Sequence, residues 1–81
     1  IMYTIYSKPN CQSCNEAKML LEMEKLPFKY LTLNKEYTLQ DMFTKIPKTH
    51  KSFPAILKNG KYLGGLADLK ADLDKYNKNI L

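Results

Sequence analysis

Arginine and tryptophan are absent from this chain of 81 residues, and histidine occurs only once. All 13 basic residues are therefore lysines, and with 8 acidic residues they give a net charge of +5. Proteins that read nucleic-acid sequences rely on arginine for bidentate contacts with bases and phosphates. The lysines are also scattered along the chain and do not form one stripe. We therefore expect no nucleic-acid partner, and we interpret the lysines as a solvated surface whose field attracts small anions or acidic proteins.

Long hydrophobic runs are missing as well, since no apolar stretch approaches the roughly 18 residues of a membrane-spanning helix. No charged and then apolar segment at the N-terminal end suggests export. A length of 81 residues with 44% hydrophobic content allows one small core, so we expect a single domain over residues 1–81. Nothing in the sequence demands a membrane or an oligomer, and we expect a monomer.

Cysteine is scarce, and its two copies, Cys11 and Cys14, lie close together in the sequence. Small secreted domains held by disulfides use about four to eight cysteines at long separations. A bond between two such close residues closes too small a loop to stabilise the fold appreciably. We therefore expect a reducing, cytoplasmic compartment in which this pair serves chemistry.

The pattern of apolar, turn-forming and helix-forming residues predicts four strands and three helices. In chain order, we expect a strand at 2–6, a helix from 11 or 12 to about 24, a strand at 28–33, a helix at 38–46, strands at 53–57 and 62–63, and a helix at 66–76. The first two strands, joined by a helix, should be parallel, and the last two should form an antiparallel hairpin. This β-α-β-α-β-β-α order predicts an α/β fold with a four-stranded mixed sheet and helices on both faces.

Local signals support these elements. Thr38 and Asp41 come close to a capping box at the start of the short helix, and Pro47 closes that helix. Asn59 followed by Gly60 is the signal of a two-residue hairpin. The final helix carries one apolar face, made of Leu66, Leu69, Leu73 and Tyr76.

Methionine and tyrosine side chains are expected to fill much of the core, and His50 is expected at the surface. Tyr6 also lies close enough to the two cysteines in the sequence to border a groove beside them. The residues assigned to packing are Met19, Met23, Met42, Tyr6, Tyr30 and Tyr62.

The segment Cys11-Gln12-Ser13-Cys14 follows a predicted strand and opens a predicted helix. The N-terminus of a helix has unpaired N–H groups and a partial positive charge, which favour a thiolate at Cys11. Lys8 adds a positive charge nearby. Together these effects are expected to lower the pKa of Cys11 from its ordinary value of about 8.5 and to create a nucleophile at neutral pH.

Cys14 falls about one helical turn after Cys11, on the same face of the helix. The spacing predicts Cα atoms roughly 5 to 5.5 Å apart, which is within the range of a disulfide. We expect Cys11 to be the outer residue and Cys14 to be partly covered. Cys11 would then attack a substrate disulfide, and Cys14 would resolve the mixed disulfide within the same molecule.

Two other interpretations of the cysteine pair remain open. A zinc site needs about four ligands, and this chain offers two cysteines and one histidine, His50. A pair of inert buried thiols is the second alternative, although a position between a turn and a helix fits it poorly. We expect no metal ion.

Two further segments indicate a binding surface near the cysteines. Phe53-Pro54 precedes the third strand, where a trans proline is the ordinary case. A cis bond there would turn the backbone of Phe53 outward, where it could pair with an extended substrate. Gly64-Gly65 makes a tight turn into the last helix, whose free N–H groups could bind a carboxylate.

These three elements, in this order, resemble those of the glutaredoxins in the thioredoxin superfamily. The likeness extends from Met2 to about Tyr76, and the small size with many lysines is similar to that of a compact bacterial or phage dithiol member. The segments that carry it are Tyr6-Ser7-Lys8-Pro9-Asn10-Cys11-Gln12-Ser13-Cys14, Ser52-Phe53-Pro54-Ala55-Ile56 and Leu63-Gly64-Gly65-Leu66-Ala67-Asp68-Leu69. The resemblance implies a thioredoxin fold and reduction of disulfides by glutathione, which acts as a co-substrate with no tightly bound cofactor.

The resemblance also assigns roles to individual residues. Cys11 matches the family's nucleophile, Cys14 its resolving cysteine and Pro54 its cis-proline. Glutathione would be bound by the residues that match the family's contacts, namely Lys8, Phe53, Pro54, Gly65, Leu66 and Ala67. Its glycyl carboxylate could meet Lys48, His50 or Lys51. The family also implies a disulfide-containing client protein such as ribonucleotide reductase.

The sequence departs from the family pattern at three places. Gln12-Ser13 stands where a Pro-Tyr pair is usual, Phe53 stands where a valine is usual, and Ala67 replaces an acid. Two alternative functions also remain open. One is a redoxin of the same chemistry that is reduced by thioredoxin reductase. The other is an iron–sulfur carrier in which Cys11 thiolates and glutathione hold a cluster between two chains.

Overall fold

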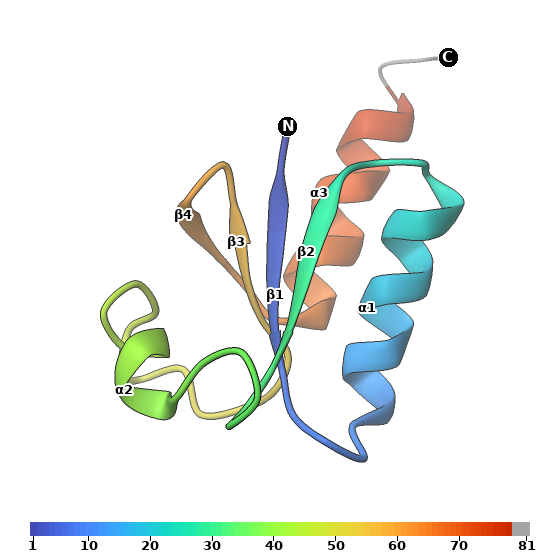
Figure 1. Ribbon diagram of the computed structural model, residues 1–81. Helices are drawn as coiled ribbons and strands as arrows, with labels where there is room; N and C mark the ends of the chain where they lie inside the picture. The colour runs from blue at the N-terminus through green and yellow to red at the C-terminus, as the bar shows by residue number, and fades with distance from the viewer. Residues whose placement is uncertain (79–81) are drawn as a thin grey trace.

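Strands and helices follow one another in the predicted order (Figure 1). The computed structural model describes the backbone of residues 1–78 and the side chains of residues 1–75. The side chain of Tyr76, assigned above to the last helix's apolar face, lies outside the described residues. The elements are β1 (Tyr3–Ser7), α1 (Gln12–Met23), β2 (Phe28–Thr32), α2 (Leu39–Met42), β3 (Ala55–Lys58), β4 (Lys61–Gly64) and α3 (Leu66–Lys78).

The strands form one mixed sheet in the order β2-β1-β3-β4. β1 pairs parallel with β2 and antiparallel with β3, and β4 pairs antiparallel with β3. The helices α1 and α3 cover one face of the sheet, and α2 lies on the other face (Figure 1). The predicted fold class, with a four-stranded mixed sheet and helices on both faces, is therefore confirmed.

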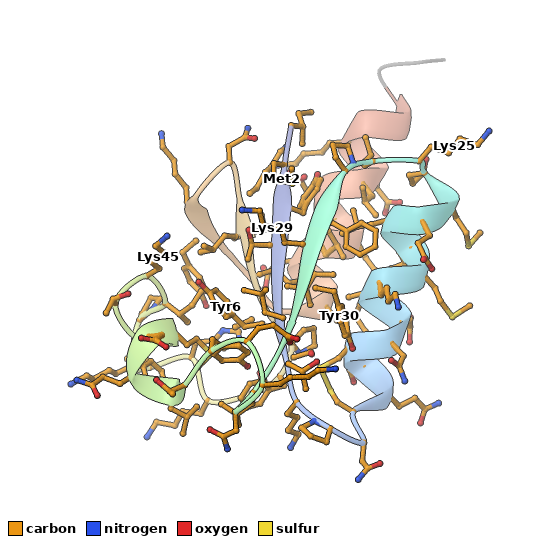
Figure 2. The ribbon with its side chains drawn as sticks, viewed as in Figure 1. Met2, Tyr6, Lys25, Lys29, Tyr30 and Lys45 are labelled. Atoms are coloured by element: carbon orange, nitrogen blue, oxygen red, sulfur yellow. A yellow bond between two sulfur atoms is a disulfide. The ribbon has the colours of Figure 1, made fainter. Side chains whose placement is uncertain are left out.

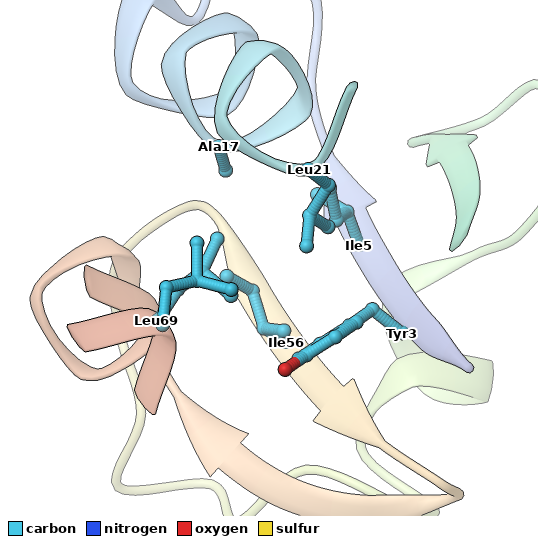
Figure 3. Packing of buried hydrophobic residues seen from close by; sticks show 7 residues of the cluster. Tyr3, Ile5, Ala17, Leu21, Ile56 and Leu69 are labelled. Carbon is cyan, nitrogen blue, oxygen red and sulfur yellow. The ribbon is translucent and has the colours of Figure 1, made fainter. Parts of the chain in front are cut away.

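The larger core lies between the sheet and the helices α1 and α3 (Figure 3). Tyr3 and Ile5 both point to this face because the side chains of a strand alternate between its two faces. Burial of a leucine or isoleucine side chain stabilises a fold by about 1.5–3 kcal/mol, so this cluster holds α1 firmly on the sheet. The buried members are Tyr3, Ile5, Ala17, Leu21, Ile56, Leu69 and Leu73.

A second apolar cluster fills the opposite face of the sheet, beside α2. The rings of Tyr6 and Tyr37 meet edge to face there, with centroids 4.9 Å apart. The burial of Tyr6 and Met42 confirms that these two residues are packing residues. The buried members of the cluster are Tyr6, Tyr37, Met42, Ile46, Ala55 and Leu57.

α2 is shorter than the helix predicted over 38–46. Its start is as expected, because Thr38 is the N-cap and forms a capping box with Asp41. After Met42 the chain continues in turns, and the hydroxyl of Thr44 donates to the carbonyl of Asp41 across 2.6 Å. A local bond of this kind competes with the continuation of a helix.

Two methionines of α1 contradict the predicted core. Met19 is 58% exposed and Met23 is 74% exposed. The buried residues of α1 are Cys14, Ala17 and Leu21, and their spacing of three and four residues defines the inner face. Met19 and Met23 lie on the other side of the helix and face solvent.

The remaining surface residues follow the sequence more closely. Lys25, Lys29 and Lys45 lie on separate parts of the molecule, as expected for scattered charges (Figure 2). Tyr30 is half-buried and its hydroxyl donates to Asn15 of α1 across 3.4 Å. Tyr62 contradicts the predicted packing, because it lies on the edge strand β4 and is 42% exposed. Within the described part of the chain, no helix has the length and apolar character needed to cross a membrane.

Candidate active site

The three segments that the sequence assigned to one surface meet at one end of the sheet (Figure 1). β1 runs into the loop that carries the cysteines, and β3 begins beside the end of β1 because Ala55 pairs with Tyr6. β4 ends at the same side, since Gly64 pairs with Ile56 of β3. The cysteine loop, Pro54 and the turn into α3 are therefore brought together by strand register.

Cys11 and Cys14 form a disulfide whose Cα atoms are 5.3 Å apart, within the predicted range. Cys11 has an extended backbone and is the N-cap of α1. The N–H of Cys14 donates a hydrogen bond to the Sγ atom of Cys11 across 3.2 Å. The first turn of α1 thus directs an N–H group and the positive end of its dipole at this sulfur, an arrangement that favours negative charge there.

The two cysteines differ in exposure. Cys11 is 9% exposed and Cys14 is completely buried. The predicted order, with Cys11 outside, is confirmed, although Cys14 is more fully covered than expected. Among the described residues, no three His, Cys, Asp or Glu side chains gather closely enough to hold a metal ion.

Lys8 and Phe53 link the cysteine loop to the segment before β3. The Nζ atom of Lys8 lies over the ring of Phe53, 5.5 Å from its centroid, within the range of a cation–π contact. Lys8 is exposed and Phe53 is half-buried. The structure therefore places two of the residues assigned to glutathione binding against each other at the edge of the site.

Pro54 follows Phe53 through a cis peptide bond, as the family resemblance implied. Pro54 itself is buried. Its carbonyl oxygen lies 3.3 Å from the Nε2 atom of His50, whose Nδ1 atom lies 2.7 Å from the hydroxyl of Tyr62. No local pattern in the sequence indicates this contact, because Tyr62 belongs to a different element of the fold.

The turn into α3 contains an acid whose role the sequence analysis missed. A Cβ atom on Gly64, whose φ is +141°, would collide with the carboxylate of Asp68. That carboxylate accepts the N–H of Gly65 across 3.0 Å. An acid three residues after the N-cap is a known capping pattern, and it was the available signal. One N–H group expected to bind a carboxylate is therefore already occupied.

The other two residues assigned to this turn have different environments. Leu66 is half-buried and packs against the larger core, whereas Ala67 is exposed. Their side chains offer no polar group, so an anion here would depend on their backbone N–H groups at the start of α3.

An apolar groove of about 520 Å³ lies on the other side of Phe53, between α2 and the loop before β3. Lys48 and Lys51 both line it and are exposed. Within residues 1–75 neither of them forms an ion pair. The groove is lined by Leu39, Met42, Phe43, Lys48, His50, Lys51, Ser52 and Phe53.

The fold and the site together define a thioredoxin-fold protein with a redox-active cysteine pair at the start of its first helix. The family model for glutaredoxin matches residues 3–63. The chain therefore belongs to the glutaredoxin family, and its chemistry is thiol–disulfide exchange.

Similar proteins agree with this assignment. A probable glutaredoxin of Acanthamoeba polyphaga mimivirus is 29% identical over 82 residues, covering 89% of this chain and 77% of the viral protein. The structure of reduced Escherichia coli glutaredoxin matches with a TM-score of 0.80 at 23% identity, over 93% of this chain and 95% of that one. Glutaredoxin 1 of Francisella tularensis, complexed with cacodylate, matches with a TM-score of 0.76 at 22% identity, over 95% and 96% of the two chains. The two structures support the thioredoxin fold.

Proposed function

We propose that this protein is a glutathione-dependent dithiol–disulfide oxidoreductase that reduces protein disulfides and glutathione mixed disulfides. The observation that carries the proposal is the asymmetry of the cysteine pair. The sulfur of Cys11 is at the helix terminus and accepts the N–H of Cys14, whereas Cys14 is fully buried behind it. One sulfur is thus suited to attack a substrate, and the other to resolve the product.

The proposed cycle transfers two electrons. The Cys11 thiolate attacks one sulfur of the client disulfide, which forms a mixed disulfide and releases the other client sulfur as a thiolate. Cys14 then loses its proton and attacks the sulfur of Cys11, which releases the second client thiol and leaves the Cys11–Cys14 disulfide. A first glutathione thiolate then attacks the sulfur of Cys11, which breaks the Cys11–Cys14 disulfide, releases the thiol of Cys14 and leaves a mixed disulfide on Cys11. A second glutathione attacks the glutathione sulfur of that mixed disulfide, which forms glutathione disulfide and releases the Cys11 thiolate.

Charge and free backbone groups support glutathione as the reductant. Its carboxylates are attracted by a chain with a net charge of +5. Lys8 and Lys48 or Lys51 offer cations on the two sides of Phe53. Pro54, Gly65, Leu66 and Ala67 remain proposed contacts. The N–H groups of Leu66 and Ala67 would serve the γ-glutamyl end, because Asp68 takes that of Gly65.

The client, the location and the assembly are also proposals. The family resemblance suggests ribonucleotide reductase as a client. A dithiol that must be reduced again after each cycle suits the cytoplasm. We propose that the protein acts as a monomer, because the cycle needs one cysteine pair only.

The electron donor is tested by supplying two reducing systems side by side. One contains NADPH, glutathione reductase and glutathione, and the other contains NADPH and thioredoxin reductase. We expect rapid NADPH consumption with a glutathionylated peptide in the first system and little in the second. Turnover with thioredoxin reductase alone would contradict the proposal and favour the alternative redoxin.

The roles of the two cysteines are tested separately. Cys14→Ser should abolish reduction of protein disulfides but retain reduction of glutathione mixed disulfides, because the latter needs only Cys11 and a second glutathione. Cys11→Ser should lose both activities. Activity of either kind in the Cys11→Ser protein would show that the nucleophile is assigned wrongly.

A further inference from the structure

The side chain of His50 joins three segments that are separate in the sequence. It comes from the loop between α2 and β3 and is half-buried. Its Nε2 atom lies 3.3 Å from the carbonyl oxygen of Pro54, and its Nδ1 atom lies 2.7 Å from the hydroxyl of Tyr62 on β4. The His50 and Tyr62 rings also meet edge to face, with centroids 5.6 Å apart.

The same imidazole borders the turn into α3. A Cβ atom built on Gly65 would lie 3.6 Å from the Cε1 atom of His50 and 3.6 Å from the carbonyl oxygen of Pro54. The backbone of Gly65 therefore packs closely against both the ring of His50 and the carbonyl of Pro54. The ring of His50 lies between two walls of the site, namely the Pro54 segment and the start of α3.

The hydrogen-bond partners of the His50 ring determine which of its two nitrogens carries the hydrogen. The carbonyl of Pro54 can only accept, so Nε2 carries a hydrogen and donates it. In the neutral ring Nδ1 then accepts a hydrogen bond from the hydroxyl of Tyr62. The backbone N–H of His50 donates to the carbonyl of Pro47 across 2.9 Å, which fixes the residue in its loop. Both ring nitrogens and the main chain of His50 are thus engaged.

We propose that His50 is a positioning residue that fixes the Pro54 segment relative to the turn into α3. The proposal rests on the proposed function, in which glutathione lies between these two walls. Walls held in place before binding reduce the ordering cost that a substrate must overcome, so the effect belongs to substrate binding. The chemical step at Cys11 should be left almost unchanged.

Two replacements of similar size separate the two bonds of the ring. In His50→Gln the amide N–H reaches about the position of Nε2, so the bond to Pro54 is retained. In His50→Asn the amide oxygen reaches about the position of Nδ1, so only the bond to Tyr62 is retained. Thr49→Ala, an exposed neighbour in the same loop, is the matched control.

We expect the KM for a glutathionylated peptide to rise about fivefold in His50→Asn, because the loss of one hydrogen bond usually weakens binding by about that factor. His50→Gln should restore KM to within about twofold of the wild type, and Thr49→Ala should have no effect. The kcat value and the rate of Cys11 alkylation in the reduced protein should stay close to those of the wild type in all three variants. Equal KM values for His50→Gln and His50→Asn would overturn the proposal, as would a fall in kcat or alkylation rate with KM unchanged.

A parallel assay uses insulin as the disulfide substrate and dithiothreitol as the reductant, so that it does not depend on glutathione. Wild-type activity with insulin but not with the glutathionylated peptide would contradict the proposed function. In that case, a KM for insulin that is raised in His50→Asn but close to the wild type in His50→Gln would still support the positioning role. Equal KM values for insulin in these two variants would contradict it.

Discussion

Cys11 and Cys14 have the same side chain but different surroundings. The sulfur of Cys11 receives an N–H at the end of a helix dipole, and that of Cys14 is enclosed by the core. In the reduced protein, we therefore expect a pKa for the Cys11 thiol below its ordinary value. Iodoacetamide at about pH 6 should label Cys11 far faster than Cys14, as measured by peptide mass analysis. Equally slow labelling of both residues would contradict the assigned roles.

Tyr37 supports the loop that leads to the cysteines. Its buried hydroxyl donates to the carbonyl of Ser7, the last residue of β1. Burial raises the pKa of Tyr37 to about 12, and the neighbouring Tyr6 and Tyr30 add to this. Because the unfolded residue ionises near 10, the folded state gains stability below pH 10 and loses it progressively toward pH 12.

Tyr37→Phe tests this single residue. At pH 8 the variant should lose about 1 kcal/mol of unfolding free energy, because the carbonyl of Ser7 loses a buried donor. Above pH 10 the difference from the wild type should shrink, since only the wild type carries the tyrosine that must ionise on unfolding. Urea titrations of both proteins across this range measure the difference. Parallel curves would contradict the raised pKa of Tyr37.

At the scale of elements, the turn between β4 and α3 depends on a residue without a side chain. Gly64 has a φ of +141° and approaches the carboxylate of Asp68, which itself caps α3. Gly64→Ala should therefore combine backbone strain with loss of this cap, and we expect a loss of more than about 2 kcal/mol of unfolding free energy.

Gly60→Ala is the matched control for that variant. Gly60 also has a positive φ, +81°, but a Cβ atom there would meet nothing within 4 Å. Gly60→Ala should lose only about 1–2 kcal/mol of unfolding free energy, which is the cost of the left-handed conformation for a residue with a side chain. Equal losses in the two variants, measured by urea unfolding, would mean that the contact with Asp68 has no influence on stability.

The elements also show what the sequence could predict. The Asn59–Gly60 hairpin and the Thr38–Asp41 capping box were foreseen because both depend on neighbouring residues. The exposure of Met19 and Met23 was missed because composition was used there, although the spacing of Cys14, Ala17 and Leu21 marks the inner face.

Some features of the candidate site can likewise be predicted from neighbouring residues, and others cannot. The distance and order of Cys11 and Cys14 follow from a short helical spacing, so both were predictable. The contact of His50 with Tyr62 depends on how α2, β4 and the intervening loop pack, and no local pattern carries that information. The cis form of the Phe53–Pro54 bond was implied by the family resemblance and not by composition.

At the scale of the whole molecule, Asp72 connects α3 to two strands. It accepts a hydrogen bond from the hydroxyl of Tyr3 across 2.7 Å and forms an ion pair with Lys58 across 2.9 Å. Burial acts to raise the pKa of Asp72, but the hydrogen bonds from Tyr3 and Lys58 and the charges of Lys58 and Lys75 outweigh it, so the pKa is lowered.

A lowered pKa at Asp72 predicts sensitivity of the fold to acid. The carboxylate stabilises the fold at pH values above its ordinary pKa of 3.8, and this contribution is lost as the pH falls below that value. Asp72→Asn should be about 1 kcal/mol less stable than the wild type at pH 6, and the gap should close toward pH 2.5. Asp74→Asn, at an exposed position of the same helix, should create no such gap. A gap at Asp72→Asn that stays constant with pH would contradict the role of its charge.

The hairpin of β3 and β4 has a practical use. Its tip at Asn59 and Gly60 follows Lys58, which pairs with Tyr3 at the start of β1, while the cysteines follow the far end of that strand. The N–H of Asn59 also donates to the carbonyl of Met2, so the tip is anchored beside the chain's beginning. A fluorophore or surface tether attached to Lys61, the exposed residue that follows Gly60, would sit at the pole remote from the sulfur atoms. A protein immobilised in this way could still exchange electrons freely with its clients.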